Sequence, residues 1–267
     1  MKLIPLFLLV GMLAMSGWAE DDRVPYSPEL VKKAELGDAE EQYNLGYALC
    51  TGTGVGKDEK KGFEWYIKSA EQGNENGQNA LGYCYQKGIG VEKDEKEAVK
   101  RFIKLAERGN AKAQYNLACC YEKGEGVGKD EKKAFEWCIK SADQGNAKAQ
   151  FALACCYAKG EGVGKDEKKA FEWYIKSAGQ GNANAQSSLG ICYESGKGIA
   201  KDGKEAVRWW TKAAEQGVAR AQCNLGICYE QGVGVGIDEK EAVKWYTKAA
   251  EQGNESAKKA LEKFKPQ

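Results

Sequence analysis

Leucine recurs at a fixed interval along this chain and marks a repeating pattern of apolar and polar positions. It stands 36 residues apart at Leu45, Leu81, Leu117, Leu153, Leu189, Leu225 and Leu261. Around Leu117, apolar side chains fall four residues before it and three and four residues after it, at Ala113, Cys120 and Tyr121. This spacing places them on one face of an α-helix. Each interval is therefore predicted to begin with an amphipathic helix.

A second helix is predicted in the other half of each interval. Phe135, Ile139 and Ala142 follow one another at helical spacing, whereas Lys132 and Glu136 belong to a solvated i, i+4 series on the other face. Aspartates able to cap this helix stand at Asp58, Asp94, Asp130, Asp166, Asp202 and Asp238. A Gly-Asn pair closes most intervals, and it suits the end of one helix and the N-cap of the next. With so short a connection, consecutive helices must be antiparallel neighbours.

One such helix pair cannot bury its own apolar face, but stacked pairs can. We therefore predict an all-α fold, a right-handed superhelical α-solenoid of antiparallel helix pairs with about 14 helices and no strands. The solenoid is expected over residues 27–267. Its six full repeats are predicted at 39–74, 75–110, 111–146, 147–182, 183–218 and 219–254, with capping half-repeats at 27–38 and 255–267.

Three motifs recur within the repeat: A-x-A-Q-Y-N-L-G-x-x-Y, G-x-G-V-x-K-D and K-A-x-x-W-Y-x-K-A-A-E-Q-G-N. They resemble Sel-1-like repeats, which are relatives of tetratricopeptide repeats with a longer loop between the helices. The resemblance implies a scaffold for protein–protein contacts. It also implies export, because bacterial members often serve as exported adaptors, envelope regulators or host-interaction proteins. The family shares no catalytic motif, so no catalytic residue and no cofactor are expected.

The first residues are typical of a secretory signal peptide. Met1-Lys2 is followed by an apolar run from Leu3 to Met15, and small residues at Gly17 and Ala19 suit cleavage after residue 19. We predict a signal peptide at 1–19, a linker at 20–26 and a periplasmic or secreted protein. The alternative is a cytosolic protein with an apolar N-terminal helix. No later segment is apolar enough to span a membrane, and mean hydropathy is −0.61.

Charge and composition exclude several classes of function. The 40 basic and 39 acidic residues nearly cancel, which argues against a nucleic-acid partner. The chain has no histidine, which removes Ser-His-Asp and Cys-His catalysis and most catalytic zinc sites. We therefore expect no metal, and a monomer is predicted. The resemblance implies a protein or peptide partner. That the ligand is a peptide rather than a glycan is implied only by the resemblance.

Two motifs could carry chemistry, and each has a simpler explanation. The loop KGEGVGKD at 123–130 has glycines and a lysine but lacks the Walker spacing and recurs in every repeat, so it is predicted to be an inter-helix turn. Ser256-Ala257-Lys258-Lys259 matches S-x-x-K, and a β-lactamase-like activity has been proposed for cysteine-rich relatives. It lies in the terminal capping helix with no K-T-G after it. A cell-wall or β-lactam enzyme and a purely structural spacer remain the alternatives to a scaffold.

Five of the ten cysteines occupy one place in the repeat, three residues after the leucine: Cys84, Cys120, Cys156, Cys192 and Cys228. This row is predicted to be buried and reduced. Equivalent positions on neighbouring repeats should lie roughly 8–10 Å apart, whereas a disulfide needs Cα atoms within about 7 Å. Cys119 and Cys155, one residue earlier, are predicted to face the groove. In an oxidising compartment, disulfides between other cysteines would still be possible.

The predicted binding groove follows the first helix of each pair. Positions two before and two after the leucine should lie opposite the second helix. Asparagine at the position immediately before the leucine could hydrogen-bond to a peptide backbone. The predicted partner-binding residues are Tyr43, Asn44, Tyr47, Asn79, Tyr83, Tyr115, Asn116, Cys119, Phe151, Cys155, Ile191, Asn224 and Ile227. The strip is aromatic towards its N-terminal end and aliphatic towards its C-terminal end. The alternative is that the tyrosines pack between repeats.

Overall fold

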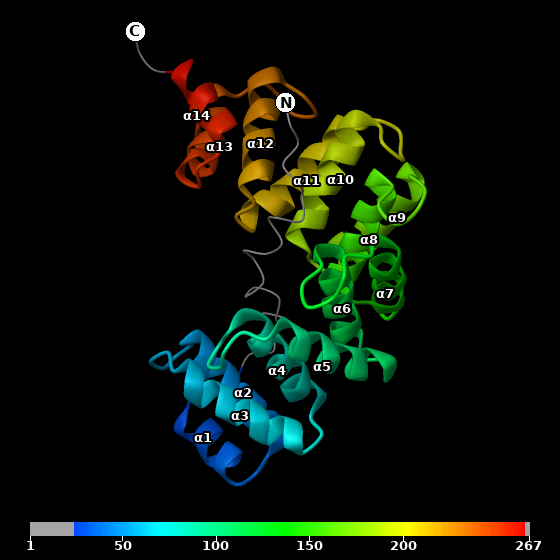
Figure 1. Cartoon of the computed structure of the whole chain (residues 1–267). Helices are drawn as coiled ribbons and strands as arrows, with labels where there is room; N and C mark the ends of the chain where they lie inside the picture. Colours follow the sequence, from blue (N-terminus) through cyan, green and yellow to red (C-terminus); the bar gives the residue numbers. More distant parts are fainter. Residues whose placement is uncertain (1–23, 265–267) are drawn as a thin grey trace. The chain divides into compact units, whose positions relative to one another are not determined.

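The computed structural model describes residues 24–264, and all of its regular elements are α-helices (Figure 1). In chain order these are α1 (Pro28–Glu35), α2 (Ala39–Thr51), α3 (Glu59–Glu71), α4 (Glu75–Lys87), α5 (Glu95–Glu107), α6 (Ala111–Lys123), α7 (Glu131–Asp143), α8 (Ala147–Lys159), α9 (Glu167–Gly179), α10 (Ala183–Ser195), α11 (Gly203–Glu215), α12 (Ala219–Gln231), α13 (Glu239–Glu251) and α14 (Glu255–Glu262). Over residues 24–264 the predicted all-α fold of 14 helices without strands is confirmed.

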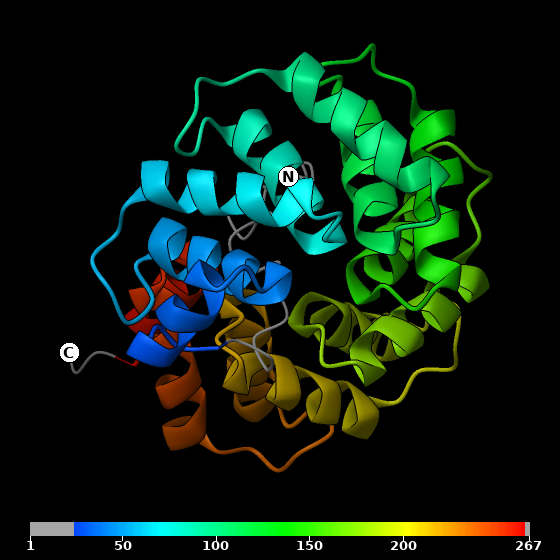
Figure 2. The ribbon, with the colours of Figure 1, turned by 90° about the horizontal axis from the view of Figure 1, so that it is seen from below.

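The chain divides into two compact units within α5. Unit 1 ends at Arg101 and holds α1 to α4, whereas unit 2 begins at Phe102 and holds α6 to α14. In both units each helix packs against the next one along the chain, and Figure 2 shows this succession from green to red in unit 2. This is the sequential packing of an α-solenoid, as predicted. The right-handed sense of the superhelix stays a prediction.

Two further predictions concern the N-terminal residues and membrane-spanning helices. The predicted signal peptide and residues 20–23 of the predicted linker lie outside the described residues. Among the helices of residues 24–264, none has the length and apolar character needed to cross a bilayer.

Capping side chains begin the helices where the repeat predicted them. The Asp130 carboxylate accepts the Lys133 amide at 3.0 Å and so caps α7, and Asp166 caps α9 in the same way. The Asn146 side chain accepts the Ala149 amide at 3.0 Å and caps α8. Val218 replaces asparagine before α12, which has no side-chain cap. The predicted N-caps of the second helices are confirmed.

The first and second helices of a pair approach closely because the residue after each leucine is small. A Cβ added to Gly226 would lie 2.5 Å from the Tyr246 ring, and one added to Gly46 would lie 2.7 Å from the Tyr66 ring. At Gly190 an added Cβ would collide with the Trp210 indole. The large aromatic side chain of the second helix therefore occupies the space beside the missing side chain.

A buried glutamine joins each first helix of unit 2 to both neighbouring second helices. Gln150 on α8 donates from Nε2 to the Ala142 carbonyl of α7 at 3.2 Å. Its Oε1 accepts a 2.7 Å hydrogen bond from Gln180 at the end of α9. The same arrangement recurs at Gln114, Gln186 and Gln222. These hydrogen bonds constrain the distance and the angle between consecutive helices. They thereby position the side chains of the first helices.

Candidate protein-binding face

The predicted groove residues lie on the even-numbered helices, which are the first helices of the pairs. Unit 1 carries Tyr43, Asn44 and Tyr47 on α2 and Asn79 and Tyr83 on α4. Unit 2 carries Tyr115, Asn116 and Cys119 on α6, Phe151 and Cys155 on α8, Ile191 on α10, and Asn224 and Ile227 on α12. The two groups are described separately below.

In unit 1 the prediction of an exposed aromatic strip is wrong. Tyr43 and Tyr47 are buried in one cluster with Tyr66 and Cys84. The Tyr43 and Tyr66 rings lie 5.9 Å apart, because Tyr66 projects from α3 towards the side of α2 that was expected to face away from it. Asn79 is also buried, and Tyr83 and Asn44 are half-buried. The tyrosines of α2 therefore contribute to the core.

In unit 2 the same correction applies to α8. Phe151 and Cys155 are buried and pack on Tyr174 of α9. The Phe151 and Tyr174 rings lie 5.9 Å apart, and the Cys155 sulfur lies 3.5 Å from the Tyr174 hydroxyl. The half-buried Cys119 and Ile191 and the 36% exposed Ile227 are the apolar groove residues of unit 2 that reach the surface two positions after the leucine.

Polar residues that the sequence analysis missed accompany these apolar ones. Five residues before the leucine, Lys112, Lys148 and Arg220 stand at the N-terminal ends of α6, α8 and α12. They lie four residues before the asparagine position, and seven before the position of Ile227, so they share one helix face. Counting back one further turn from the asparagines would have found them. We call the following set the unit 2 face: Lys112, Asn116, Cys119, Lys148, Ile191, Arg220, Asn224 and Ile227.

Burial changes the acidity of Glu122, which follows Cys119 by one turn on α6. Its pKa is about 7, above the usual 4.5, chiefly because burial penalises the charged carboxylate. Lys123 lowers the pKa and Glu161 raises it. Near neutral pH this side chain is therefore divided between a carboxylate and a neutral acid that can donate a hydrogen bond.

Burial also shifts the pKa values of Lys148 and Cys119. The pKa of Lys148 is lowered to about 8, chiefly by burial, while Cys119 raises it and the nearby charge of Lys112 lowers it. Burial raises the pKa of the Cys119 thiol to about 11. Helices α6 and α8 thus hold three partly dehydrated polar groups, and such groups are often found where proteins bind ligands.

Replacing Glu122 by glutamine is expected to flatten the pH dependence of stability. The folded chain keeps a proton on Glu122 that the unfolded chain releases above about pH 4.5. Stability is therefore highest below that pH and falls as pH rises through 7, by about 1–2 kcal/mol once partial exposure is allowed for. Urea unfolding at pH 5.5, 6.5 and 7.5 measures the slope. The exposed Glu194, at the same place on α10, provides the control Glu194→Gln; equal slopes in both variants would contradict the assignment.

The cysteine row is mostly buried, with one exchange of neighbours. Cys84, Cys120, Cys192 and Cys228 are buried as predicted, and all ten cysteines are thiols in the structure. At α8 the prediction is wrong, because Cys155 is buried and Cys156 is half-buried. Cys155 takes the inner place because Tyr174 supplies a contact for its sulfur.

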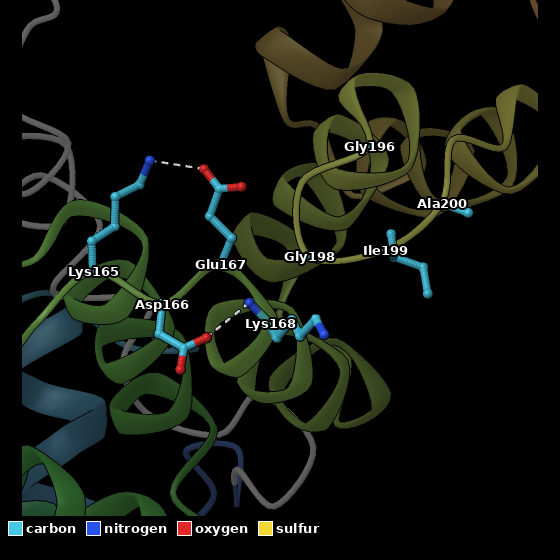
Figure 3. Close-up of a pocket in the computed structure, with 8 residues that line it drawn as sticks. All are labelled: Lys165, Asp166, Glu167, Lys168, Gly196, Gly198, Ile199 and Ala200. Carbon is cyan, nitrogen blue, oxygen red and sulfur yellow. Dashed lines mark hydrogen bonds and ion pairs between the residues drawn. The ribbon is translucent and has the colours of Figure 1, made fainter.

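The glycine loops form turns whose charged groups pair with each other. Figure 3 shows an open depression where the loop before α9, with Lys165 and Asp166, faces the loop after α10, with Gly198 and Ile199. Lys165 pairs with Glu167 at 2.8 Å, and Asp166 caps α9. The helix N-terminus that would bind a phosphate is thus occupied by Asp166, which supports the predicted inter-helix turn.

No cluster of three or more potential ligands among histidine, cysteine, aspartate and glutamate is placed to hold a metal ion within residues 24–264. Ser256 of the S-x-x-K match is exposed on α14, where Lys258 pairs with Glu255 at 2.8 Å.

Helix pairs that pack in sequence and share one repeating pattern of polar and apolar positions define an α-solenoid repeat protein. The model of the Sel1 repeat matches residues 42–74, 76–110, 111–146, 147–182, 183–218 and 219–254. The chain belongs to the Sel1 repeat family.

Two solved structures are 35% identical to the chain. The Sel1 repeat protein from Oxalobacter formigenes superposes with a TM-score of 0.76, over 85% of this chain and 91% of that one. A protective antigen present in uropathogenic Escherichia coli strains, which displays this fold, gives 0.73 over 86% of this chain and 49% of that one, so the chain spans about half of its length. An immunity protein from Pseudomonas aeruginosa, 20% identical, shares the fold with a TM-score of 0.57, over 89% of this chain and 87% of that one. No curated protein matches the chain.

Proposed function

We propose that the chain is an exported scaffold that binds a protein or peptide on the unit 2 face. The observation that carries this proposal is the exposure of apolar side chains in a row with amide and basic ones. Ile227 is 36% exposed on α12, Ile191 is half-buried at the same place on α10, and these two helices are in contact. Apolar surface bordered by polar groups is typical of interaction sites.

The polar members of the face favour an extended partner segment with acidic residues. Asn116 and Asn224 bring amides that can both donate to and accept from a peptide backbone. Lys112, Lys148 and Arg220 add positive charge at helix N-termini, where the helix dipole has the same sign. Electrostatic complementarity of this kind steers association and fixes the register of the partner.

A scaffold is favoured over an enzyme because the perturbed groups do not form a catalytic set. Glu122 and Lys148 have shifted pKa values, yet each shift arises first from burial rather than from a hydrogen bond to a nucleophile. Ser256 lies on α14, which carries neither of these groups. Export is part of the proposal and is supported by residues 1–19. The mature chain expressed in a bacterium would then begin at Glu20.

The binding test compares two pairs of isoleucines. The immobilised protein is used to capture partners from envelope and culture-medium extracts, and the captured protein is then titrated against variants. Ile191→Ser with Ile227→Ser is expected to weaken binding at least about tenfold. Ile175→Ser with Ile237→Ser is the control, because these side chains are 41% and 70% exposed outside the unit 2 face.

All four isoleucines are partly or largely exposed, so circular dichroism and the melting temperature should change little in either variant. Equal affinity of the two double variants would contradict the proposal. A Tyr47 variant would be a poor test, because Tyr47 is buried and its loss would destabilise unit 1.

A further inference from the structure

Two cysteines on successive first helices of unit 1 are buried in one side-chain cluster. Cys50 lies near the end of α2 and Cys84 lies on α4, and both belong to the buried cluster that also contains Tyr66. The Cys50 thiol donates to the Glu59 carbonyl at 3.8 Å and so lies against the start of α3. Both cysteines therefore lie in the same cluster as Phe63 and Tyr66 of α3, between successive first helices.

The sequence of the first repeat departs from the others in a way that makes room for Cys50. Five residues after the leucine, the other full repeats have Gln86, Glu122, Ala158, Glu194 and Glu230. Gly62 on α3 faces Cys50. At the equivalent position the other full repeats have alanine: Ala98, Ala134, Ala170, Ala206 and Ala242. A Cβ on Gly62 would collide with the Cys50 sulfur. The cysteine and the glycine are thus two matched departures from the repeat.

The spacing argument against disulfides along the cysteine row does not apply to this pair. The position on α2 equivalent to Cys84 is Ala48, and Cys50 lies two residues beyond it. Elsewhere the thiols have other partners: Cys138 hydrogen-bonds to the Ala149 carbonyl at 3.2 Å and Cys155 to Tyr174 at 3.5 Å.

We propose that Cys50 and Cys84 form a disulfide that links α2 to α4. The bond forms by exchange with a disulfide such as oxidised glutathione or the oxidised dithiol of a thiol oxidase. The Cys50 thiolate attacks one sulfur of the oxidant and releases one thiol. The Cys84 thiolate then attacks the Cys50 sulfur and releases the second. The two protein thiols are oxidised, the oxidant is reduced to two thiols, and the two protons pass to those thiols.

The local environment sets the order of these steps. Interaction with the Cys84 side chain lowers the pKa of the Cys50 thiol, whereas the pKa of Cys84 is raised. Cys50 is therefore the first to ionise and attack. Both residues are buried, at 5% and 2% exposure, so exchange takes place while unit 1 folds or opens locally. Once formed, the bond is shielded from reductants.

The test uses the full chain refolded in a mixture of reduced and oxidised glutathione. The protein is alkylated while denatured and unreduced, then digested with trypsin. Residues 34–57 and 69–87 are expected as one linked species, because each of these tryptic peptides contains one of the two cysteines. The other eight cysteines should be alkylated. Dithiothreitol should lower the melting temperature by about 5–10 °C.

Cys50→Ser and Cys84→Ser should each abolish both the link and the response to dithiothreitol. Cys192→Ser and Cys228→Ser are the matched controls, because they are buried members of the row in unit 2 and should retain the link. Separate alkylated 34–57 and 69–87 peptides in the wild type, or a link between other cysteines, would overturn the proposal. The wild-type digest decides this even if a serine variant fails to fold.

Discussion

Gly162→Ala is expected to destabilise unit 2 by about 2–4 kcal/mol. Gly162 is the second glycine of the loop after α8 and has φ of 71°. An alanine in this left-handed conformation costs about 1–2 kcal/mol. Its Cβ would also collide with the Glu131 carbonyl and lie 3.0 Å from Phe135 Cβ. Glu131 begins α7, so its carbonyl cannot move away without shifting that helix.

Gly164→Ala is the matched control for this prediction. Gly164 belongs to the same loop, lacks a positive φ, and has open space where a Cβ would lie. Urea unfolding followed by circular dichroism should place this variant within about 0.5 kcal/mol of the wild type. A Gly162→Ala variant as stable as Gly164→Ala would show that the loop tolerates a side chain at this position and that the close contact with α7 is not required.

The sequence was sufficient to predict the helices but not this contact between repeats. Apolar spacing and capping residues act within one repeat, so the register of α7 and its Asp130 cap could be read directly from the chain. The close approach of Gly162 to Glu131 joins one repeat to the preceding one. A local pattern shows only that glycine recurs in the loop, because the reason lies 31 residues earlier in the chain.

The exposure of the predicted groove residues was predicted only in part, for a related reason. The helical pattern placed the residues two before and two after the leucine opposite the second helix. In α8, however, every residue from Ala149 to Cys155 is buried, so no side of that segment is left for solvent. A first helix in a solenoid is surrounded by the second helices before and after it. Only the contacts made by Tyr174 reveal that Phe151 belongs to the core.

Gln150→Leu is expected to cost about 2–3 kcal/mol, although leucine is similar in size and the site is buried. The substitution removes two hydrogen bonds, one to the Ala142 carbonyl and one from Gln180. Each net hydrogen bond is worth about 0.5–1.5 kcal/mol, and a buried group left unsatisfied costs more. The Ala142 carbonyl keeps its bond from the Gly145 amide, which limits the loss. Gln231→Leu, at an exposed position on α12, should be close to neutral.

A double-mutant cycle separates this network from the simple loss of a polar side chain. Gln180→Leu leaves Oε1 of the buried Gln150 without the donor it has at 2.7 Å, so it should also be destabilising. Once Gln150 is leucine, that penalty is gone, and the double variant should be less destabilised than the sum of the two single variants by about 0.5–1 kcal/mol. Strict additivity in urea unfolding would mean that the two glutamines act independently. Coupling would show that the hydrogen bond between the two side chains itself contributes to the packing of α8 against α9.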